Sequence, residues 1–139
     1  MIGAPTTRID VFFDTNVVAY LFGRETEKLA RSHELIGAGG LVSVQVLNEL
    51  TLVARREMRK TWPEVHEILE GLRAKCGVLP VTLDVHERGL LYAERYGLNV
   101  YDAMIVAAAA LAGCTTLYTE DLHDGLVIDG VTIRNPYAG

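Results

Sequence analysis

The sequence predicts a three-layer α/β/α domain in which helices cover both faces of a central, mainly parallel sheet. Short β-branched and aromatic runs alternate along the chain with helical patterns that each cover several turns. This alternation favours parallel strands, because a helix between two strands of one sheet returns the chain to the starting edge. The length of 139 residues fits one hydrophobic core, so we expect a single domain over residues 1–139.

The first strand is predicted at residues 9–13, a β-branched and aromatic run. The polar residues Asp14-Thr15-Asn16 follow it, and such side chains cap free N–H groups at a helix start, so a helix is expected from there through Leu21. The next helix, over residues 25–36, carries one apolar stripe and stops at the glycine-rich segment 37–40.

Residues 41–44 form the second predicted strand, and the following helix starts at Ser43 or Gln45 and has apolar positions up to Ala54. Pro63 suits the first turn of another helix, since proline has no N–H group to satisfy there, and this helix stops before Gly77. Residues 78–82 form the third strand.

Residues 84–96 are helical in pattern and end at Gly97, a residue suited to a left-handed C-cap. The helix that starts near Asp102 and continues to residue 112 is apolar on every side, which predicts a central position. Residues 115–118 form the fourth strand. Asp129-Gly130 is the turn signal of a β-hairpin expected over residues 127–133.

Composition limits the functional classes. The formal net charge of −5 argues against a protein that binds nucleic acid through a large basic surface, but it does not exclude a nuclease whose acids hold cations. No apolar run is long enough to cross a bilayer, and the segment 1–8 lacks the features of a secretory signal, so a soluble cytoplasmic protein without a membrane partner is expected. Cys76 and Cys114 lack zinc-site spacing and are expected to be buried thiols.

Acidic residues stand where predicted strands give way to helices. Asp14 follows the first strand, the pair Glu120 and Asp121 follows the fourth, and Glu49 and Asp102 lie in early turns of helices that can point at the same edge. Carboxylates that share one pocket need a cation to offset their repulsion, and an all-oxygen ligand set favours Mg²⁺ or Mn²⁺ over zinc. These positions therefore predict metal-dependent phosphodiester chemistry.

Four segments resemble, in order, the motifs of PIN-domain ribonucleases, most closely the VapC toxins of toxin–antitoxin modules. They are residues 13–17 (FDTNV), 45–50 (QVLNEL), 101–107 (YDAMIVA) and 117–122 (LYTEDL), and residues 130–137 are similar to the C-terminal strand of that family. The resemblance implies a PIN-like fold, Mg²⁺- or Mn²⁺-dependent endonucleolytic cleavage of RNA, homodimerisation and inhibition by a cognate antitoxin protein.

The resemblance also implies roles for individual residues. It places metal-ligand and catalytic roles on Asp14, Glu49, Asp102 and Asp121, with Glu120 as a further acid at a position that varies in the family. Thr15, Asn16 and Thr119 are implied to orient carboxylates or waters. Simpler interpretations stay open from the residues alone: Asp14 and Asp102 can be helix-capping acids, and Glu120 and Asp121 can be turn residues.

Arg55, Arg56, Arg59 and Lys60 form the densest basic cluster, assigned to the helix that carries Glu49. By helical spacing, Glu49, Val53, Arg56 and Lys60 share one stripe. This cluster can contact an RNA backbone or an acidic partner segment, or it can be a solvated helix face.

Three other functions compete with the nuclease. A haloacid-dehalogenase-like phosphatase needs a second Asp where Asn16 stands. A receiver domain needs a lysine after a late strand, whereas Lys28, Lys60 and Lys75 all precede the third strand. A PIN fold that acts only as a partner-binding scaffold is the non-enzymatic alternative, and the presence of every expected acid favours catalysis over it.

Overall fold

The computed structural model describes residues 8–138, so most of the N-terminal segment assessed for a targeting signal lies outside the described residues. The strands are β1 (Val11–Phe13), β2 (Gly40–Ser43), β3 (Cys76–Leu79), β4 (Thr116–Tyr118), β5 (Val127–Ile128) and β6 (Val131–Arg134). The helices are α1 (Thr15–Ala19), the 3₁₀ turn η1 (Tyr20–Phe22), α2 (Thr26–Gly37), α3 (Val44–Arg56), α4 (Trp62–Lys75), α5 (Leu83–Tyr96) and α6 (Val100–Leu111).

The strands form one six-stranded sheet in the order β3-β2-β1-β4-β6-β5. β1 lies inside the sheet and pairs in parallel with β2 and β4, so that Phe12 is opposite both Leu41 and Leu117. β3 and β6 extend the parallel sheet, and only β5 runs antiparallel to its neighbour. The prediction of a mainly parallel sheet is confirmed, and the carboxyl ends of β1 and β4 meet at one edge.

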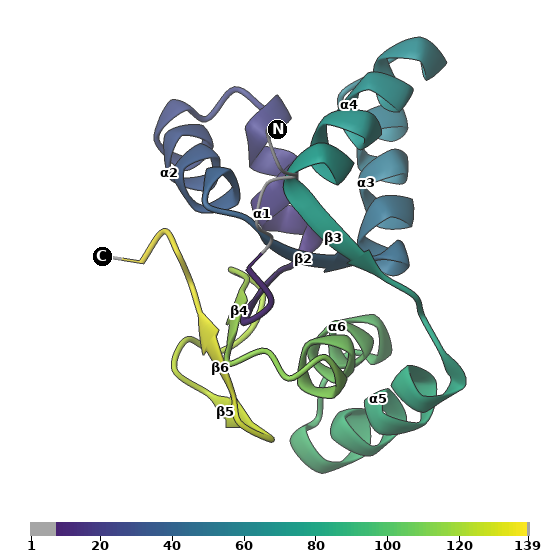
Figure 1. The fold of residues 1–139 in the computed structure, drawn as a ribbon, viewed down its shortest axis with the longest axis vertical. Coiled ribbons are helices and arrows are strands. Elements are labelled where there is room, and N and C mark those ends of the chain that lie inside the picture. Colours follow the sequence, from purple (N-terminus) through teal and green to yellow (C-terminus); the bar gives the residue numbers. More distant parts are fainter. Residues whose placement is uncertain (1–7, 139) are drawn as a thin grey trace, which may run out of the picture.

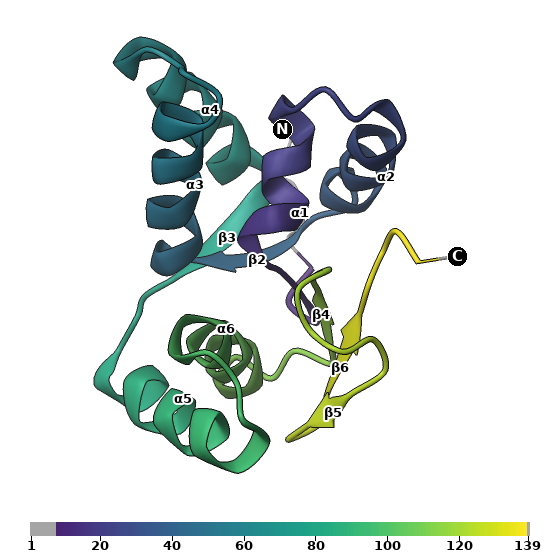
Figure 2. The same cartoon turned by 180° about the vertical axis from the view of Figure 1, so that it is seen from behind.

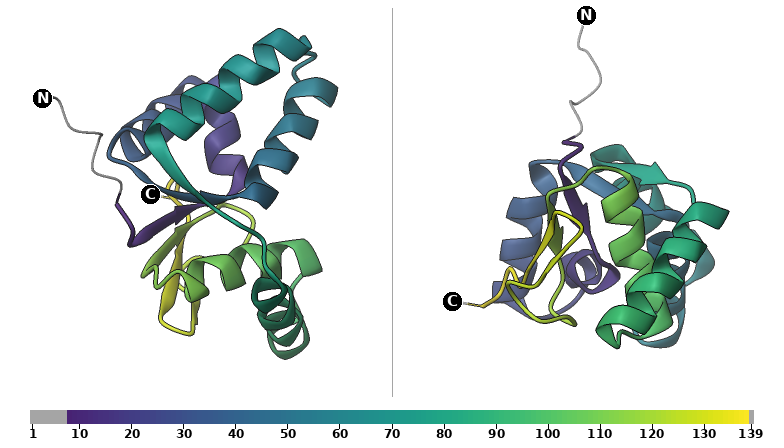
Figure 3. Two further views of the ribbon diagram at one scale, coloured as in Figure 1. Left: turned by 45° about the vertical axis from the view of Figure 1, so that its right-hand side comes forward. Right: turned by 90° about the horizontal axis from the view of Figure 1, so that it is seen from below.

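Helices cover both faces of this sheet (Figures 1 and 2). The helices α1 to α4 lie on one face, and α5 and α6 lie on the other (Figure 3). α6 contacts β4 and β6, and its residues 103–109 are buried, which confirms the central position predicted from its apolar sequence. Across residues 8–138, no helix is both long and apolar enough to cross a membrane.

The hairpin at the C-terminal end forms at the predicted turn. Asp129 and Gly130, between β5 and β6, both have positive φ angles, of 46° and 82°, as a two-residue hairpin turn requires. The Asp129 carboxylate accepts hydrogen bonds from Tyr92 and Arg88, so the turn is tied to α5.

The helix that carries Glu49 ends before two residues of the basic cluster that were predicted to lie on it. α3 ends at Arg56, and the chain turns back so that the Lys60 N–H donates to Ala54 O at 2.9 Å. Arg59 takes a φ angle of 54°, outside the helical region, so the prediction that Arg59 and Lys60 belong to this helix is wrong. The cause is the next helix, whose capping box at Thr61 fixes the chain direction just after Lys60.

Candidate metal centre and active site

Asp14 is fixed where β1 passes into α1. Its N–H donates to Tyr118 O at 3.0 Å, which continues the pairing of β1 with β4. Its carboxylate accepts hydrogen bonds from the Thr15 N–H at 2.7 Å and from the Thr119 hydroxyl at 2.8 Å. Only 4% of Asp14 is exposed, so its carboxylate is buried and held by groups that directly follow β1 and β4.

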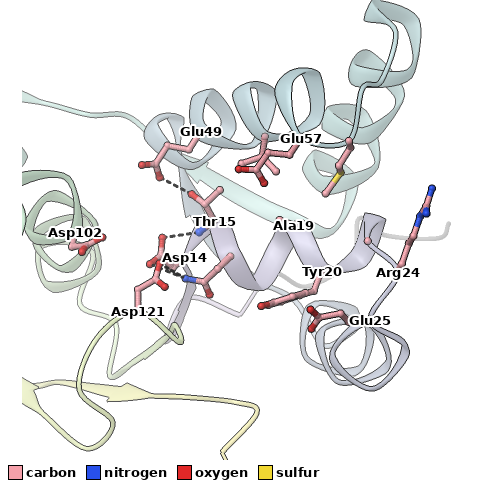
Figure 4. Close-up of a pocket in the computed structure, with 14 residues that line it drawn as sticks. Asp14, Thr15, Ala19, Tyr20, Arg24, Glu25, Glu49, Glu57, Asp102 and Asp121 are labelled. Carbon is pink, nitrogen blue, oxygen red and sulfur yellow. Dashed lines mark hydrogen bonds between the residues drawn. The ribbon is translucent and has the colours of Figure 1, made fainter.

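Three predicted acids come together around this position. Carboxylate oxygens of Asp14, Asp102 and Asp121 all lie within 4.8 Å of one another (Figure 4). Asp14 comes from the end of β1, Asp102 from the first turn of α6, and Asp121 from the loop after β4. The carboxyl-edge argument made from the sequence thus holds for these residues, and the group of three is called the acidic group below.

The proximity of these acids changes their ionisation. The pKa of Asp14 is raised to about 7, chiefly by burial and also by the charges of Glu49 and Asp102, while the hydrogen bonds from Thr119 and Thr15 lower it. Burial, with the charges of Asp121 and Glu49, also raises the pKa of Asp102. A divalent cation at this place would remove the cause of both shifts, which is the cost of unneutralised negative charge.

Glu49 lies near the acidic group but is not a member of it. It projects from α3 into the same cavity, and its Oε1 accepts a hydrogen bond from the Thr15 hydroxyl at 2.6 Å (Figure 4). The effect of its charge on the pKa values of Asp14 and Asp102 shows that it shares their electrostatic environment.

Asn16 and Thr119 connect two members of the acidic group, Asp14 and Asp121. The Asn16 side-chain amide donates to Asp121 at 2.9 Å and to the Thr119 hydroxyl at 3.1 Å, and lies 3.5 Å from Asp14 Oδ2. Its carbonyl oxygen accepts the Glu120 N–H at 3.3 Å. The contacts of Thr15, Asn16 and Thr119 are those expected of groups that orient carboxylates.

Glu120 is the one predicted acid that the structure directs elsewhere. Its carboxylate accepts hydrogen bonds from the Tyr20 hydroxyl and from Lys28 Nζ, the latter at 2.9 Å. Lys28, which lies on α2, compensates the charge of Glu120. Glu120 therefore faces away from the acidic group, while Asp121 faces into it.

The acidic group opens into a cavity of about 450 Å³ between α1, η1 and α3. Sequence reasoning missed several of its lining residues, which are Tyr20, Arg24, Glu25, Glu57 and Met58. Glu57 could have been found from helical spacing, because it follows Glu49 and Val53 at intervals of four, whereas the predicted stripe passed through Arg56 and Lys60 instead. The cavity wall includes Arg24 as its only cation among the described residues, at the end opposite Asp102 in Figure 4.

The basic cluster lies at the turn between α3 and α4. Arg55 is engaged locally: its guanidinium is 4.5 Å from the centre of the Trp62 ring and donates to Lys60 O at 2.8 Å. Arg56 and Arg59 are exposed. Among these residues, Arg56 and Arg59 therefore present the cations most available to a ligand.

The family model of the PIN domain matches residues 11–123, a range that contains every acid of this site. The chain belongs to the PIN domain family. Against curated proteins, the sequence of this PIN domain has no match.

Solved structures of the same fold include toxins. A toxin–antitoxin complex from Klebsiella pneumoniae has a chain that is 24% identical, with a TM-score of 0.71 over 91% of this chain and 98% of that one. VapBC from Salmonella typhimurium bound to DNA gives 21% identity and a TM-score of 0.69 over 93% and 99%. VapC20 of Mycobacterium tuberculosis, a sarcin–ricin loop cleaving toxin, is 20% identical, with a TM-score of 0.66 over 80% of this chain and 91% of that one. This PIN domain thus has the fold of VapC-like toxins, as the sequence motifs indicated.

Proposed function

We propose that this PIN domain is a divalent-metal-dependent endoribonuclease and the toxin of a toxin–antitoxin pair. The observation that carries the proposal is the acidic group, in which carboxylate oxygens from three distant segments lie within 4.8 Å of one another. An all-oxygen donor set of this kind suits Mg²⁺ or Mn²⁺. Family membership and the likeness to VapC toxins support nuclease chemistry at this group.

Asp14, Asp102 and Asp121 would hold the ion, and we keep Glu49 in the proposed catalytic set. A bound divalent ion lowers the pKa of a water and neutralises charge at the phosphate under attack. Thr15 holds Oε1 of Glu49, and among the described residues no hydrogen bond reaches its other oxygen, which is therefore available to orient a water. Asn16 and Thr119 would keep Asp14 and Asp121 in place as their charges are neutralised.

The proposed substrate is RNA, single-stranded or folded. The cavity contains Arg24, and Arg56 and Arg59 are exposed at the far end of α3, where cations can contact the phosphate backbone. Arg55 and Lys60 would support that surface by the contact between them. The same basic surface suits an acidic segment of a protein partner, and competition between the two ligands would inhibit cleavage.

An antitoxin protein and a second copy of the chain are the proposed partners, in the cytoplasm. Structural neighbours solved as toxin–antitoxin complexes support the antitoxin. An apolar hollow beside the N-terminal ends of α3 and α6 supports self-association, because Val44, Val81, Val100 and Tyr101 line it and are each at least 40% exposed.

A fluorogenic RNA assay tests the enzymatic proposal. Purified protein should cleave RNA with Mg²⁺ or Mn²⁺ and stop when EDTA is added. Asp14→Asn should keep the fold, judged by circular dichroism, and lose at least about 100-fold in rate. Asp84→Asn, which changes an exposed acid in the first turn of α5, is the matched control and should cleave like the wild type. Cleavage that persists without metal would contradict the proposed metal dependence, and no cleavage across varied RNAs would favour the partner-binding scaffold instead.

A further inference from the structure

Two neighbouring acids at the end of β4 face in opposite directions. Asp121 belongs to the acidic group and accepts the Asn16 amide at 2.9 Å. Glu120 turns toward α2, where the Tyr20 hydroxyl and Lys28 Nζ donate to its carboxylate. A single peptide unit separates these side chains, so the orientation of one constrains the other.

Lys28 occupies a small aromatic cage. Its Nζ lies 4.7 Å from the centre of the Tyr20 ring and 5.3 Å from the centre of the Tyr137 ring, and the two rings meet edge to face at 5.1 Å. Nζ also donates to the Tyr20 hydroxyl at 3.0 Å. These hydrogen bonds raise the pKa of Lys28, so the ammonium group stays charged beside Glu120.

The C-terminal segment closes this cage. The Tyr137 and Ser32 hydroxyls share a hydrogen bond of 2.5 Å, and Arg31 Nε donates to Pro136 O at 3.2 Å. Both contacts attach residues 136–137 to α2. The end of the chain is thereby placed against the cation that compensates Glu120.

We propose that Lys28 and Tyr137 are positioning residues of the acidic group: they retain Glu120 outside it and so orient the peptide that carries Asp121. The inference rests on the proposed function, because the role that it gives to Lys28 and Tyr137 is to support metal binding at the acidic group. The side chain of Glu120 is only 22% exposed, and among residues 8–138 Lys28 is the cation that pairs with its charge. Without Lys28, Glu120 gains from turning toward solvent or, once an ion is bound, toward the acidic group, and either movement would rotate Asp121.

The affinity for Mn²⁺, measured by titration calorimetry, tests this role. Lys28→Met removes the cation and keeps an apolar chain between the rings, and we expect binding about 10-fold weaker. Tyr137→Ala should weaken binding in the same direction, whereas Tyr137→Phe retains the ring and should stay near wild type. The control is Arg88→Met, which breaks a different ion pair, Arg88–Asp129 at 3.4 Å, and should leave Mn²⁺ affinity unchanged.

A second-site change separates positioning from general destabilisation. Glu120→Gln in the Lys28→Met background removes the uncompensated charge and should recover most of the lost affinity. In metal-free protein, the side-chain amide signals of Asn16 in ¹H–¹⁵N NMR spectra should shift in Lys28→Met and in Tyr137→Ala, since that amide donates to Asp121. They should not shift in Arg88→Met.

The outcomes distinguish this inference from the proposed function. If wild-type protein binds no Mn²⁺, the proposed metal-dependent nuclease function is overturned. The Asn16 side-chain signals of metal-free protein would still test whether Lys28 and Tyr137 position Asp121. Wild-type binding that is matched by Lys28→Met and Tyr137→Ala, with unchanged Asn16 signals, overturns the positioning role alone. Tighter Mn²⁺ binding in Lys28→Met also contradicts the positioning role. It would mean that Glu120, once released from Lys28, contributes to metal binding as a ligand.

Discussion

The Thr15 hydroxyl donates a 2.6 Å hydrogen bond to Glu49, and this bond joins the first turn of α1 to α3. Thr15 directly follows Asp14, and its N–H binds the Asp14 carboxylate. One residue therefore holds two acids of the site, one through its backbone and one through its side chain. Thr15 therefore links Asp14 at the end of β1 to Glu49 on α3.

Thr15→Val tests this link. Valine fills the same buried volume but cannot donate to Glu49, so we expect the rate of RNA cleavage to fall by about 10-fold. Thr15→Ser keeps the hydroxyl and should stay within about twofold of the wild type. Initial rates at saturating metal, with melting temperatures measured in parallel, provide the comparison. Full activity in Thr15→Val would mean that Glu49 needs no hydrogen bond to stay in place.

The raised pKa of Asp14 predicts how stability depends on pH in metal-free protein. The folded state holds the Asp14 proton up to about pH 7, whereas the ordinary value is 3.8, so folding favours the protonated form. This contribution is fully present below about pH 4 and is lost as the pH rises toward 7. Urea unfolding in EDTA should show Asp14→Asn gaining on the wild type between pH 4 and pH 8, by up to on the order of 4 kcal/mol. A constant difference across that range would contradict the shift.

Metal binding should depend on the same proton. An ion at the acidic group requires ionised Asp14, so the affinity for Mn²⁺ should rise by up to about 10-fold per pH unit between pH 5 and 7. Thermal shift at fixed Mn²⁺ should therefore be larger at pH 8 than at pH 6, with about 2.7 kcal/mol of stabilisation at an ion concentration of 100 Kd. EDTA should reverse it. Asp14→Asn protein that keeps the wild-type thermal shift and its pH dependence would place the ion elsewhere.

Gly40 predicts a packing effect close to the site. A Cβ atom there would lie 2.4 Å from Cε2 of the Phe13 ring, the residue that precedes Asp14. Gly40→Ala should destabilise the fold by about 1–3 kcal/mol in urea unfolding. Gly71, on the exposed side of α4, has no atom within 4 Å of an added Cβ. Gly71→Ala should be neutral or stabilising by up to about 1 kcal/mol, because alanine favours helix.

The two thiols should react only when the protein opens. Cys76 and Cys114 are buried, and burial raises the pKa of each thiol to about 11. Labelling with a disulfide reagent at pH 8 should be slow in native protein and rapid in denaturant, with mass spectrometry locating the modified residue. Fast labelling of either thiol in native protein would show that its element opens locally.

Local sequence patterns predicted most of the elements because each depends on nearby residues. The hairpin around Asp129-Gly130 and the buried helix α6 follow from turn chemistry and from hydrophobicity alone. The end of α3 did not follow, since helical spacing continues through Arg56 to Lys60 while the capping box at Thr61 redirects the chain. Helix propensity depends on the residues within a segment, so it does not include the effect of the next helix, which here determines where α3 ends.

The acidic group could be predicted in part. The ends of β1 and β4 meet because the strands are parallel neighbours, so Asp14 and Asp121 were expected together. The pairing of Glu120 with Lys28 was not foreseeable, because it depends on where α2 packs and on Tyr137 at the opposite end of the chain. Sequence alone ranked Glu120 and Asp121 by motif position, and only the packing of α2 explains why they diverge.

The internal position of β1 has a consequence for synthesis. Asn16 and Asp121 are 105 residues apart, yet the amide of one holds the carboxylate of the other, and β4 is itself held by the late strand β6. A ribosome must therefore translate β4 and the loop that carries Asp121 before the acids can meet. A nascent chain that stops before β4 carries Asp14 but lacks Asp121, so the acidic group can assemble only after β4 and the loop that follows it have been translated.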